Sequence, residues 1–389
     1  MTKKWSSRLT FFAFVVLMVG LGSNDSLRGI FSTIFQEHFS LTTTQLGLIV
    51  TASYIGNLVF LLVGGNLSTR FSKKRVLQVL ILIWMVALAL FAFTSNYTVL
   101  LIGMALALGS STLLNTTMNL ITPLLFATAP GFFVNFLFFT QKIGTSGSQY
   151  ILGSHADGFA FWQHTNLVLL ILGAVAFALL LFCNVPEEAA APADAPAQKG
   201  GYDWRIIVPY VLVFGFYFIA EHGVMNWMVA YGVDGLGLPQ ASAAKYLSVF
   251  FGGMMIGRLC LSPLVDKLGA LKSLAAFGGV SCVLYLIGSL GGAVTMPVWA
   301  ISGLSFSILY PTLVMSIRLY FPAQQVSGAA GTILSIASLA DILFNVGFGK
   351  LVDMTGYAVS IRVLPLSALA FFIVFMLFTK FCKPTQKLK

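Results

Sequence analysis

"GGNLSTRFSKKR", residues 64–75, is a short basic segment between two long apolar runs of a 389-residue chain. Runs of about 18 apolar residues or more are long enough to cross the hydrocarbon core of a bilayer as a helix. The whole chain is 58 % hydrophobic and only 9 % charged, whereas a soluble domain is roughly 25 % charged. We therefore expect an integral membrane protein in which this segment connects two membrane-spanning helices.

Twelve apolar runs are long enough to span, so the sequence predicts an all-α membrane protein. The predicted spans are 9–35, 44–66, 76–94, 97–120, 131–153, 166–183, 205–232, 243–265, 271–291, 294–317, 326–350 and 357–380. Their continuous apolar character disfavours a transmembrane β-barrel, whose strands alternate apolar and polar residues. The first run is expected to be retained rather than cleaved as a signal peptide, because it is long and is interrupted by Asn24 and Asp25.

Most of the 22 Lys and Arg residues fall on one side of this predicted topology. By the positive-inside rule that side is the cytoplasm. The expected protein is thus a multi-pass protein of the cytoplasmic membrane with an even number of spans and both termini in the cytoplasm. The net charge of +10 is then explained by topology and by contact with anionic membrane lipids, and it does not indicate nucleic-acid binding.

The chain is predicted to consist of two six-helix bundles, residues 1–183 and 205–389, joined by a cytoplasmic linker. Residues 184–204 read "NVPEEAAAPADAPAQKGGYDW" and are rich in Ala, Pro and charge, a composition typical of linkers. An offset of about 197 residues places Arg8 on Arg205 and brings Asp25 within one position of Glu221. Such weak internal repetition is expected of a transporter with two six-helix halves.

The opening segment has a counterpart in the second half, "GRLCLSPLVDKLGALK", residues 257–272. Both resemble the loop signature of the major facilitator superfamily, in which a glycine permits a tight turn and charged residues hold neighbouring helix ends. The first copy has Thr69 and Ser72 where the signature has an acid and a glycine, and it keeps Gly65, Arg70 and Lys73. The second copy has Ser262 at the first glycine and keeps Asp266, Lys267, Gly269 and Lys272. A plain basic loop would explain one copy, whereas two copies at matching positions indicate gating loops.

Within that superfamily the chain is similar to the fucose, galactose and glucose symporters over essentially its whole length. The similarity lies in "NDSLRGIFSTIFQEHFSLTTTQLGLIVTASYIG" from Asn24, in "YLSVFFGGMMIGR" ending at Arg258, and in "SFSILYPTLVMSIR" with Tyr310. The resemblance implies that Asp25 takes part in solute and proton coupling, and that Asn119 is a polar position of the fourth span. Asn115 stands where the fucose permease has a glutamate, and Glu221 where it has a glutamine.

Among the ionisable residues inside predicted spans, five are candidates for a functional role: Asp25, Lys142, Glu221, Arg258 and Asp341. A charge at mid-membrane costs about 2.5–3.5 kcal/mol, so such residues normally face a cavity or a partner. Asp25 either serves coupling or pairs with Arg28, three residues further on. Lys142 either belongs to the site or is a counter-charge to an acid of the other half. Arg258 is expected to have a gating or structural role, and Asp341 either contacts solute or bridges helices.

A sugar site needs amides and carboxylates for hydroxyl groups and aromatic faces for the ring. The predicted spans supply the amides of Gln141, Asn115, Asn119, Asn226 and Asn345. Trp227 and Tyr231 supply aromatic faces, and together with Glu221 they could line one cavity if the helix were broken at Gly223. The alternative for these two aromatics is an interfacial belt.

These features predict a transporter whose halves rock about a central site and carry a sugar or similar small polar solute inward with protons. The runner-up is an exporter of amphipathic compounds from the same superfamily. The sequence has no GxSxG, HExxH or P-loop motif, so we expect neither an enzyme nor an ATP-driven pump. Four scattered cysteines without a CxxC pair indicate no metal site. No cofactor is expected, and a monomer suffices.

Overall fold

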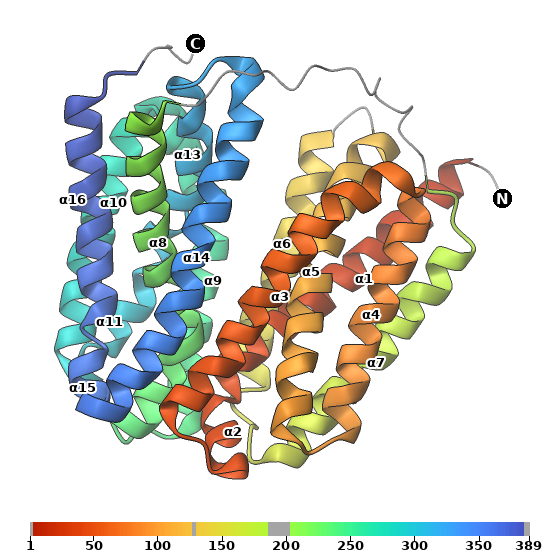
Figure 1. Ribbon diagram of the computed structural model, residues 1–389, viewed down its shortest axis with the longest axis horizontal. Coiled ribbons are helices and arrows are strands. Elements are labelled where there is room, and N and C mark those ends of the chain that lie inside the picture. The colour runs from red at the N-terminus through yellow and green to blue at the C-terminus, as the bar shows by residue number, and fades with distance from the viewer. Residues whose placement is uncertain (1–2, 127–129, 186–202, 385–389) are drawn as a thin grey trace. The chain divides into compact units, whose positions relative to one another are not determined.

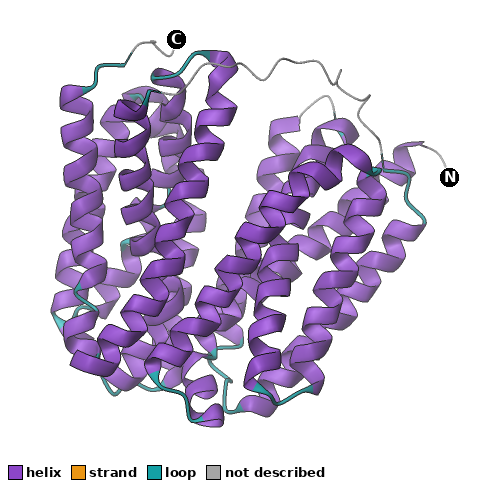
Figure 2. Ribbon diagram, viewed as in Figure 1, coloured by secondary structure: helices purple, strands orange, loops and turns teal. Residues whose placement is uncertain are grey.

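The structure is a computed structural model that describes residues 3–126, 130–185 and 203–384 (Figure 1). Within these ranges every regular element is helical and no strand is present (Figure 2). The chain divides into two compact units, Met1–Ala195 and Pro196–Lys389. The predicted linker 184–204 lies mostly outside the described residues, so its conformation and its exact bounds stay predictions.

Seven helices lie in the described part of the first unit. They are α1 (Lys3–Ile30), α2 (Ser32–Phe39), α3 (Thr43–Arg70), α4 (Lys73–Phe93), α5 (Tyr97–Leu125), α6 (Pro130–Ile151) and α7 (Phe159–Leu181). The predicted span 9–35 is in fact two helices that meet at Phe31, and Ser40 ends the second of them in the left-handed conformation. The predicted span 166–183 begins earlier, at Phe159, because Gln163 and His164 interrupt the apolar run without ending the helix.

The second unit is built from longer helices and several short pieces. The long ones are α8 (Trp204–Ala230), α9 (Gln240–Leu268), α10 (Ala270–Leu290), α14 (Ala323–Thr355) and α16 (Val363–Phe381). The short α-helices are α11 (Met296–Ile301), α12 (Gly303–Phe306), α13 (Leu309–Ser316) and α15 (Tyr357–Ser360). A π-helical turn, η1 (Tyr231–Gly235), extends α8, and 3₁₀ turns η2 (Gly292–Val294) and η3 (Ile317–Leu319) flank α11–α13.

The predicted span 294–317 is the most broken. Here α11, α12 and α13 follow one another as separate pieces. The hydroxyls of Ser302, Ser305 and Ser307 each bond the carbonyl three residues earlier, and such local bonds compete with the regular helical pattern. Together the pieces still form one apolar segment, Met296–Leu319, long enough to cross a membrane.

In the described part of the chain, eleven helical segments are long and apolar enough to cross a membrane. The remaining predicted span, 131–153, coincides with α6, whose polar residues include Gln141, Lys142 and Thr145. Each of the twelve predicted runs therefore corresponds to a helical segment. The protein is an all-α integral membrane protein.

The same helix pairings occur in both units. In the first unit α1 packs against α6 and α7, and α5 packs against α3 and α4. In the second unit α8 packs against α14 and α16, and α11 packs against α9 and α10. Thus α1 corresponds to α8 and α6 to α14. The internal repeat seen in the sequence is a repeat of structure.

Basic residues of the first unit gather at one end of its bundle. Ser6, near the start of α1, accepts a hydrogen bond from the backbone of Asn184 at 2.8 Å. The ammonium group of Lys74 donates to the carbonyl oxygens of Leu181 and Cys183 at 3.1 and 2.7 Å. The beginnings of α1 and α4 and the end of α7 therefore lie together, as alternating helices require.

Candidate functional site

Helices α1 and α6 approach each other closely in the middle of the first unit. A side chain at Gly22 would overlap the carbonyl oxygen of Gln141, and one at Gly144 would overlap that of Val19. The hydroxyl of Thr145 donates to the Gly22 carbonyl oxygen at 3.1 Å. Small residues at a helix crossing permit this close packing. Asp25 lies one turn beyond Gly22 on α1, and Gln141 and Lys142 lie at the crossing on α6.

Two cations act on the Asp25 carboxylate, Arg28 and then Lys142. The hydroxyl of Ser111, on α5, donates to Oδ1 of Asp25 at 3.4 Å. The guanidinium group of Arg28 also lies over the Tyr54 ring, 5.4 Å from its centre. The predicted interaction of Arg28 with Asp25 is therefore present, and Lys142 interacts with the same carboxylate. The interaction of Lys142 with Asp25 lies within the first unit, and a role of Lys142 as counter-charge to an acid of the other half stays a prediction.

Three predicted amides form one chain of hydrogen bonds. The amide of Asn119 donates to Oδ1 of Asn115 at 2.6 Å, and the amide of Asn115 donates to Oε1 of Gln141 at 3.0 Å. Oδ1 of Asn119 is buried and accepts no hydrogen bond from the described residues. Ser111 and Asn115 lie one turn apart on α5, so the amide chain and Asp25 form one cluster, which we call the first-unit polar cluster.

A second polar network joins α8 to α14. Nδ1 of His222 lies 2.7 Å from Oδ2 of Asp341, which is buried. One turn further along α14, Oδ1 of Asn345 accepts a hydrogen bond from the Trp227 indole at 2.9 Å and one from the Asn226 amide at 3.5 Å. These contacts support the helix-bridging interpretation of Asp341.

Glu221 is buried among the aromatic rings of the second unit. It lies close enough to Tyr217, Tyr285 and Tyr310 to act on them electrostatically. Arg258, which donates to the carbonyl oxygen of Ser307 at 3.3 Å, acts on Tyr217 and Tyr310 as well. Glu221, Tyr310 and Arg258 thus form one group. Tyr217 and Tyr310 interact electrostatically with both the acid Glu221 and the base Arg258.

The expected role of Trp227 and Tyr231 needs correction. Helix α8 runs unbroken through Gly223, where a side chain would overlap Leu364 of α16. Gly223 therefore serves close packing and does not create a break. Trp227 is fully buried beside Phe348, and Tyr231 is buried beside Trp299. Neither belongs to an interfacial belt, because both are covered by their own unit.

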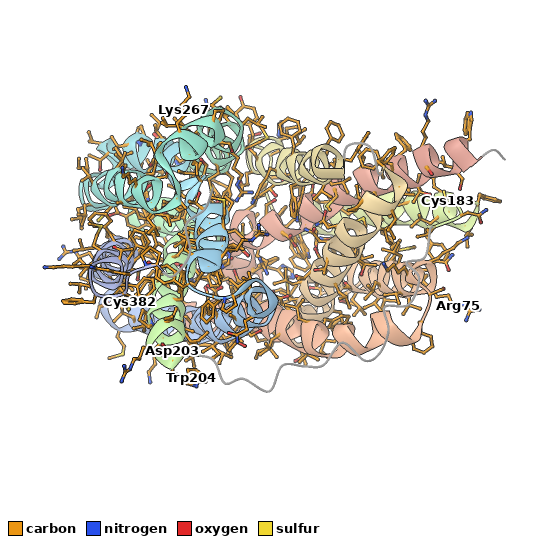
Figure 3. All side chains as sticks on the ribbon, turned by 90° about the horizontal axis from the view of Figure 1, so that it is seen from above. Arg75, Cys183, Asp203, Trp204, Lys267 and Cys382 are labelled. Carbon is orange, nitrogen blue, oxygen red and sulfur yellow. The ribbon has the colours of Figure 1, made fainter. Side chains whose placement is uncertain are left out.

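The two loops that the sequence predicts to be gating loops differ in how they turn. Gly269, between α9 and α10, has a positive φ of 80°, which favours glycine. In the first copy Ser72 caps α4 instead, and its hydroxyl accepts a bond from the backbone of Arg75 at 3.4 Å. Lys73 begins α4, and Lys267 lies in the last turn of α9 and projects outward (Figure 3). The side chains of Arg70 and Asp266 lie outside the described residues, so their predicted contacts stay predictions.

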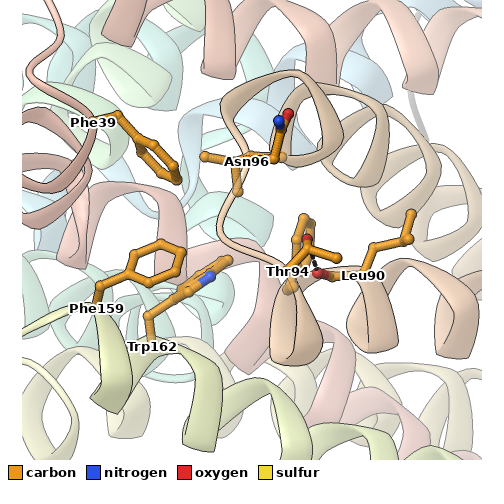
Figure 4. Close-up of a pocket in the computed structure, with 8 residues that line it drawn as sticks. Phe39, Leu90, Thr94, Asn96, Phe159 and Trp162 are labelled. Atoms are coloured by element: carbon orange, nitrogen blue, oxygen red, sulfur yellow. Dashed lines mark hydrogen bonds between the residues drawn. The ribbon is translucent and has the colours of Figure 1, made fainter.

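A small apolar pocket lies at the opposite end of the first unit (Figure 4). Its walls are the eight residues Phe39, Leu90, Phe91, Thr94, Asn96, Leu100, Phe159 and Trp162. The space between them is too narrow to admit a water molecule. Nearby, the His38 ring stacks on Phe159 with centres 3.9 Å apart. This pocket is a packing feature that fastens α2 to α4 and α7, and it is no solute site.

The sequence did not indicate the contacts of three residues in these clusters. Arg28 was considered only as an alternative partner of Asp25, whereas Ser111 and the role of His222 were not anticipated. Their signal was positional: Ser111 lies one turn before Asn115, and an offset of 197 residues places His222 on Asp25. Among the described residues, no group of three His, Cys, Asp or Glu side chains is placed to hold a metal ion, and the four cysteines are free.

The sequence model of the Major Facilitator Superfamily matches residues 10–339. The chain belongs to this superfamily. It is a multi-pass membrane transporter rather than an enzyme.

Curated relatives confirm the resemblance to sugar symporters. The L-fucose-proton symporter of Escherichia coli is 24% identical over 333 residues, which cover 74% of this chain and 75% of that protein. The glucose/galactose transporter of Brucella abortus is 27% identical over 344 residues, with 82% and 81% covered. The hexuronate transporter of Bacillus subtilis is 26% identical over 366 residues, with 85% and 84% covered. The crystal structure of a D-xylose-proton symporter has the same fold, with a TM-score of 0.77, 15% identity and 99% of both chains covered.

Proposed function

We propose that this transporter is a proton-coupled symporter that carries a sugar or a similar small polar solute across the cytoplasmic membrane. The observation that carries the proposal is the first-unit polar cluster. It joins three amides to a carboxylate inside an otherwise apolar bundle. Buried polar groups are costly unless they are hydrogen-bonded, so such a cluster in a membrane protein points to a polar ligand.

The chemistry of the cluster suits a solute with several hydroxyl groups. Amides offer donors and acceptors, and a carboxylate accepts two or more hydrogen bonds. Oδ1 of Asn119 accepts no bond from the described residues, and a solute hydroxyl or a water would complete it. This polarity favours a sugar-like solute over the amphipathic compounds of the runner-up exporter.

The names of the relatives support the same class of solute. They describe transport of fucose with protons, of glucose or galactose, and of hexuronates. All three are polyhydroxylated six-carbon sugars or their acids. For this chain the proton remains part of the proposal, with Asp25 and Glu221 as the candidate carriers. Asp25 is half-buried at the first-unit polar cluster, and Glu221 is buried in the second unit.

The proposed orientation places both termini in the cytoplasm. In the first unit, the bonds from Asn184 to Ser6 and from Lys74 to the end of α7 put the basic residues near those positions at one end. In the second unit, the Tyr320 hydroxyl donates to the Cys382 carbonyl oxygen at 3.4 Å. Arg318 and Lys383, which follows Cys382 directly, therefore also share one end. Basic residues normally face the cytoplasm, where anionic lipids attract them. We propose a monomer in contact with lipid.

Uptake into proteoliposomes tests the proposal. We expect labelled sugars or sugar acids to accumulate when an inward proton gradient is imposed, and accumulation to collapse when a protonophore is added. Asn115→Leu should lower uptake about tenfold or more, which corresponds to ~1.4 kcal/mol. Thr116→Val, on the exposed side of the same helix, should leave uptake unchanged. Absence of uptake across a panel of sugars and sugar acids, or uptake indifferent to the gradient, would contradict the proposal.

A further inference from the structure

The hydroxyl groups along α5 are bonded in two different ways. Four of them donate to the carbonyl oxygen four residues earlier in the same helix, and these are Ser110, Thr116, Thr117 and Thr122. This is a common local bond of serine and threonine inside a helix. The hydroxyl of Ser111 instead donates across to α1, to Oδ1 of Asp25 at 3.4 Å. Ser111 therefore directs its hydroxyl group at a candidate proton carrier.

Ser111 also lies next to the amide chain of the first-unit polar cluster. It is buried, and Asn115 follows one turn later on α5. The amide of Asn115 donates to Oε1 of Gln141 at 3.0 Å. Residues four apart lie on the same face of a helix. One face of α5 thus carries both the bond to the acid and the bond that joins the amides of α5 to α6.

Two charged groups act on the Asp25 carboxylate besides this hydrogen bond. They are Arg28, one turn further along α1, and Lys142 on α6. The other ionisable side chains of the helices that pack against α1 do not act on Asp25, and these are Glu37, His38, Tyr97, Tyr150 and His164. Ser111 is the uncharged donor among the groups at the carboxylate. A change at Ser111 therefore alters one hydrogen bond and leaves the charges in place.

A hydroxyl group can bond to either form of the acid. An ionised carboxylate only accepts hydrogen bonds, whereas a protonated carboxyl group also donates one. Ser111 donates to the carboxylate oxygen of Asp25 in the structure. When Asp25 is protonated, it can donate to Oγ of Ser111, and the Ser111 hydroxyl can turn to a carbonyl oxygen of its own helix, as its neighbours on α5 do. An alanine at this position would bond to neither form.

We infer that Ser111 is a positioning residue for proton coupling, which holds the Asp25 carboxyl group beside the amide chain in both protonation states and sets the pH range in which Asp25 binds its proton. A hydrogen bond to a charged group is roughly twice as strong as a neutral one, so the Ser111 hydroxyl favours the ionised form. Without this hydroxyl, Asp25 should keep its proton up to a higher pH. The inference rests on the proposed function, in which Asp25 is a candidate proton carrier.

The pH dependence of uptake into proteoliposomes tests the inference. Uptake of a sugar or sugar acid that the unaltered protein transports is measured at a series of external pH values, with the same pH difference across the membrane each time. We expect the fall of uptake at high pH to occur about half a pH unit higher in Ser111→Ala, which corresponds to ~0.7 kcal/mol. Ser110→Ala is the matched control, because it removes a buried hydroxyl from the preceding residue of α5. Its pH dependence should equal that of the unaltered protein.

The outcomes separate the inference from the proposed function. If uptake by Ser111→Ala falls by the same factor at every pH, or its pH dependence is unchanged, moves to lower pH or moves equally in Ser110→Ala, the inference is overturned. Proton-driven uptake by the unaltered protein would leave the proposed function intact in each of these cases, and its absence would overturn both. If Ser111→Ala does not fold, Ser111→Cys carries the test, since a thiol is a weaker donor than a hydroxyl. A pH dependence equal to that of the unaltered protein would then contradict the role of Ser111.

Discussion

The α1–α6 and α8–α14 interfaces are equivalent in the structural repeat, yet their ionisable groups are arranged in opposite order. In the first unit the acid, Asp25, is on α1 and the cation, Lys142, is on α6. In the second unit the basic group, His222, is on α8 and the acid, Asp341, is on α14. Asp25 and Lys142 are half-buried, whereas Asp341 is 1% exposed. We propose that the same scaffold offers charged groups to a ligand in the first unit and pairs them with each other in the second.

The polar neighbours of the two interfaces differ in the same way. In the first unit the chain of amides ends in an oxygen atom that accepts no bond from the described residues. In the second unit Oδ1 of Asn345 accepts a hydrogen bond from the Trp227 indole. The amide nitrogen of Asn345 donates to the backbone carbonyl oxygen of Asp341 at 2.7 Å. Oδ1 of Asp341 is likewise buried and accepts no bond from the described residues, so the contrast rests on the bonds that join α8 to α14 through Asn345 and Asp341. We propose that the first interface serves binding and that the second holds helices together.

The largest effect is expected from a side chain at the α1–α6 crossing. Gly144→Leu would place atoms on the Val19 carbonyl group, and a backbone cannot yield as a flexible side chain does. We expect little monodisperse protein by size-exclusion chromatography. Gly147→Leu, three residues further along α6, meets open space and should give monodisperse protein. A Gly144→Leu protein with an unchanged melting temperature would show that the crossing is looser than described.

Breaking the His222–Asp341 pair of the second unit should have the next largest effect. Asp341→Leu leaves His222 without its carboxylate; because the His222 side chain is 24% exposed, the cost should lie below the ~3–5 kcal/mol that loss of one partner of a fully buried ion pair causes. We expect a clearly lower melting temperature. The double change His222→Phe with Asp341→Leu should recover much of this loss, since both polar partners are then apolar. Asp25→Leu, in contrast, should lower uptake strongly while it changes the melting temperature little. An equal fall of the melting temperature in Asp25→Leu and Asp341→Leu would contradict the proposed difference between the two interfaces.

Glu221→Gln should separate folding from coupling. The amide has nearly the shape of the acid and keeps its place among the tyrosines, so folding and membrane insertion should be retained. It cannot carry a proton, so accumulation driven by a proton gradient should fall to the level seen without the gradient. The measurement is uptake with and without the gradient, beside a melting curve. Accumulation equal to that of the unaltered protein would assign Glu221 a structural role.

The smallest effect is expected from Trp227→Phe. The change removes the hydrogen bond to Asn345 but keeps a large aromatic side chain beside Phe348. A buried hydrogen bond contributes about 1 kcal/mol, so the melting temperature should fall slightly while the concentration of solute at half-maximal uptake stays the same. A large increase in that concentration would instead place Trp227 at the solute, as the sequence first suggested.

The spans, the repeat and the superfamily could be predicted because length, hydropathy and two matching loops record them directly. The breaks between α1 and α2 and within Met296–Leu319 could not, since single residues such as Phe31 and Ser302 interrupt helices without interrupting hydropathy. The amides of the first unit could be proposed from residue type. Their joining into one chain depends on the glycine crossing of α1 and α6, which is a contact between residues more than 100 positions apart.

The environment of Trp227 could not be predicted from the sequence. Its position near the end of a span is compatible with a belt, a cavity or a packed interior, and residue spacing alone does not separate these. The partner that decides, Asn345, lies on a helix 118 residues away in the chain. Burial of a polar aromatic therefore follows from the packing of α8 on α14 and not from the local sequence.

The most direct test of the account is proton movement caused by the solute itself. Proteoliposomes containing a pH-sensitive dye and no imposed proton gradient are mixed in turn with each member of the panel of sugars and sugar acids. We expect entry of the transported solute to acidify the lumen in the unaltered protein, and Asp25→Asn to abolish the acidification although the protein melts normally. Solute entry without a pH change in the unaltered protein would contradict proton-coupled transport.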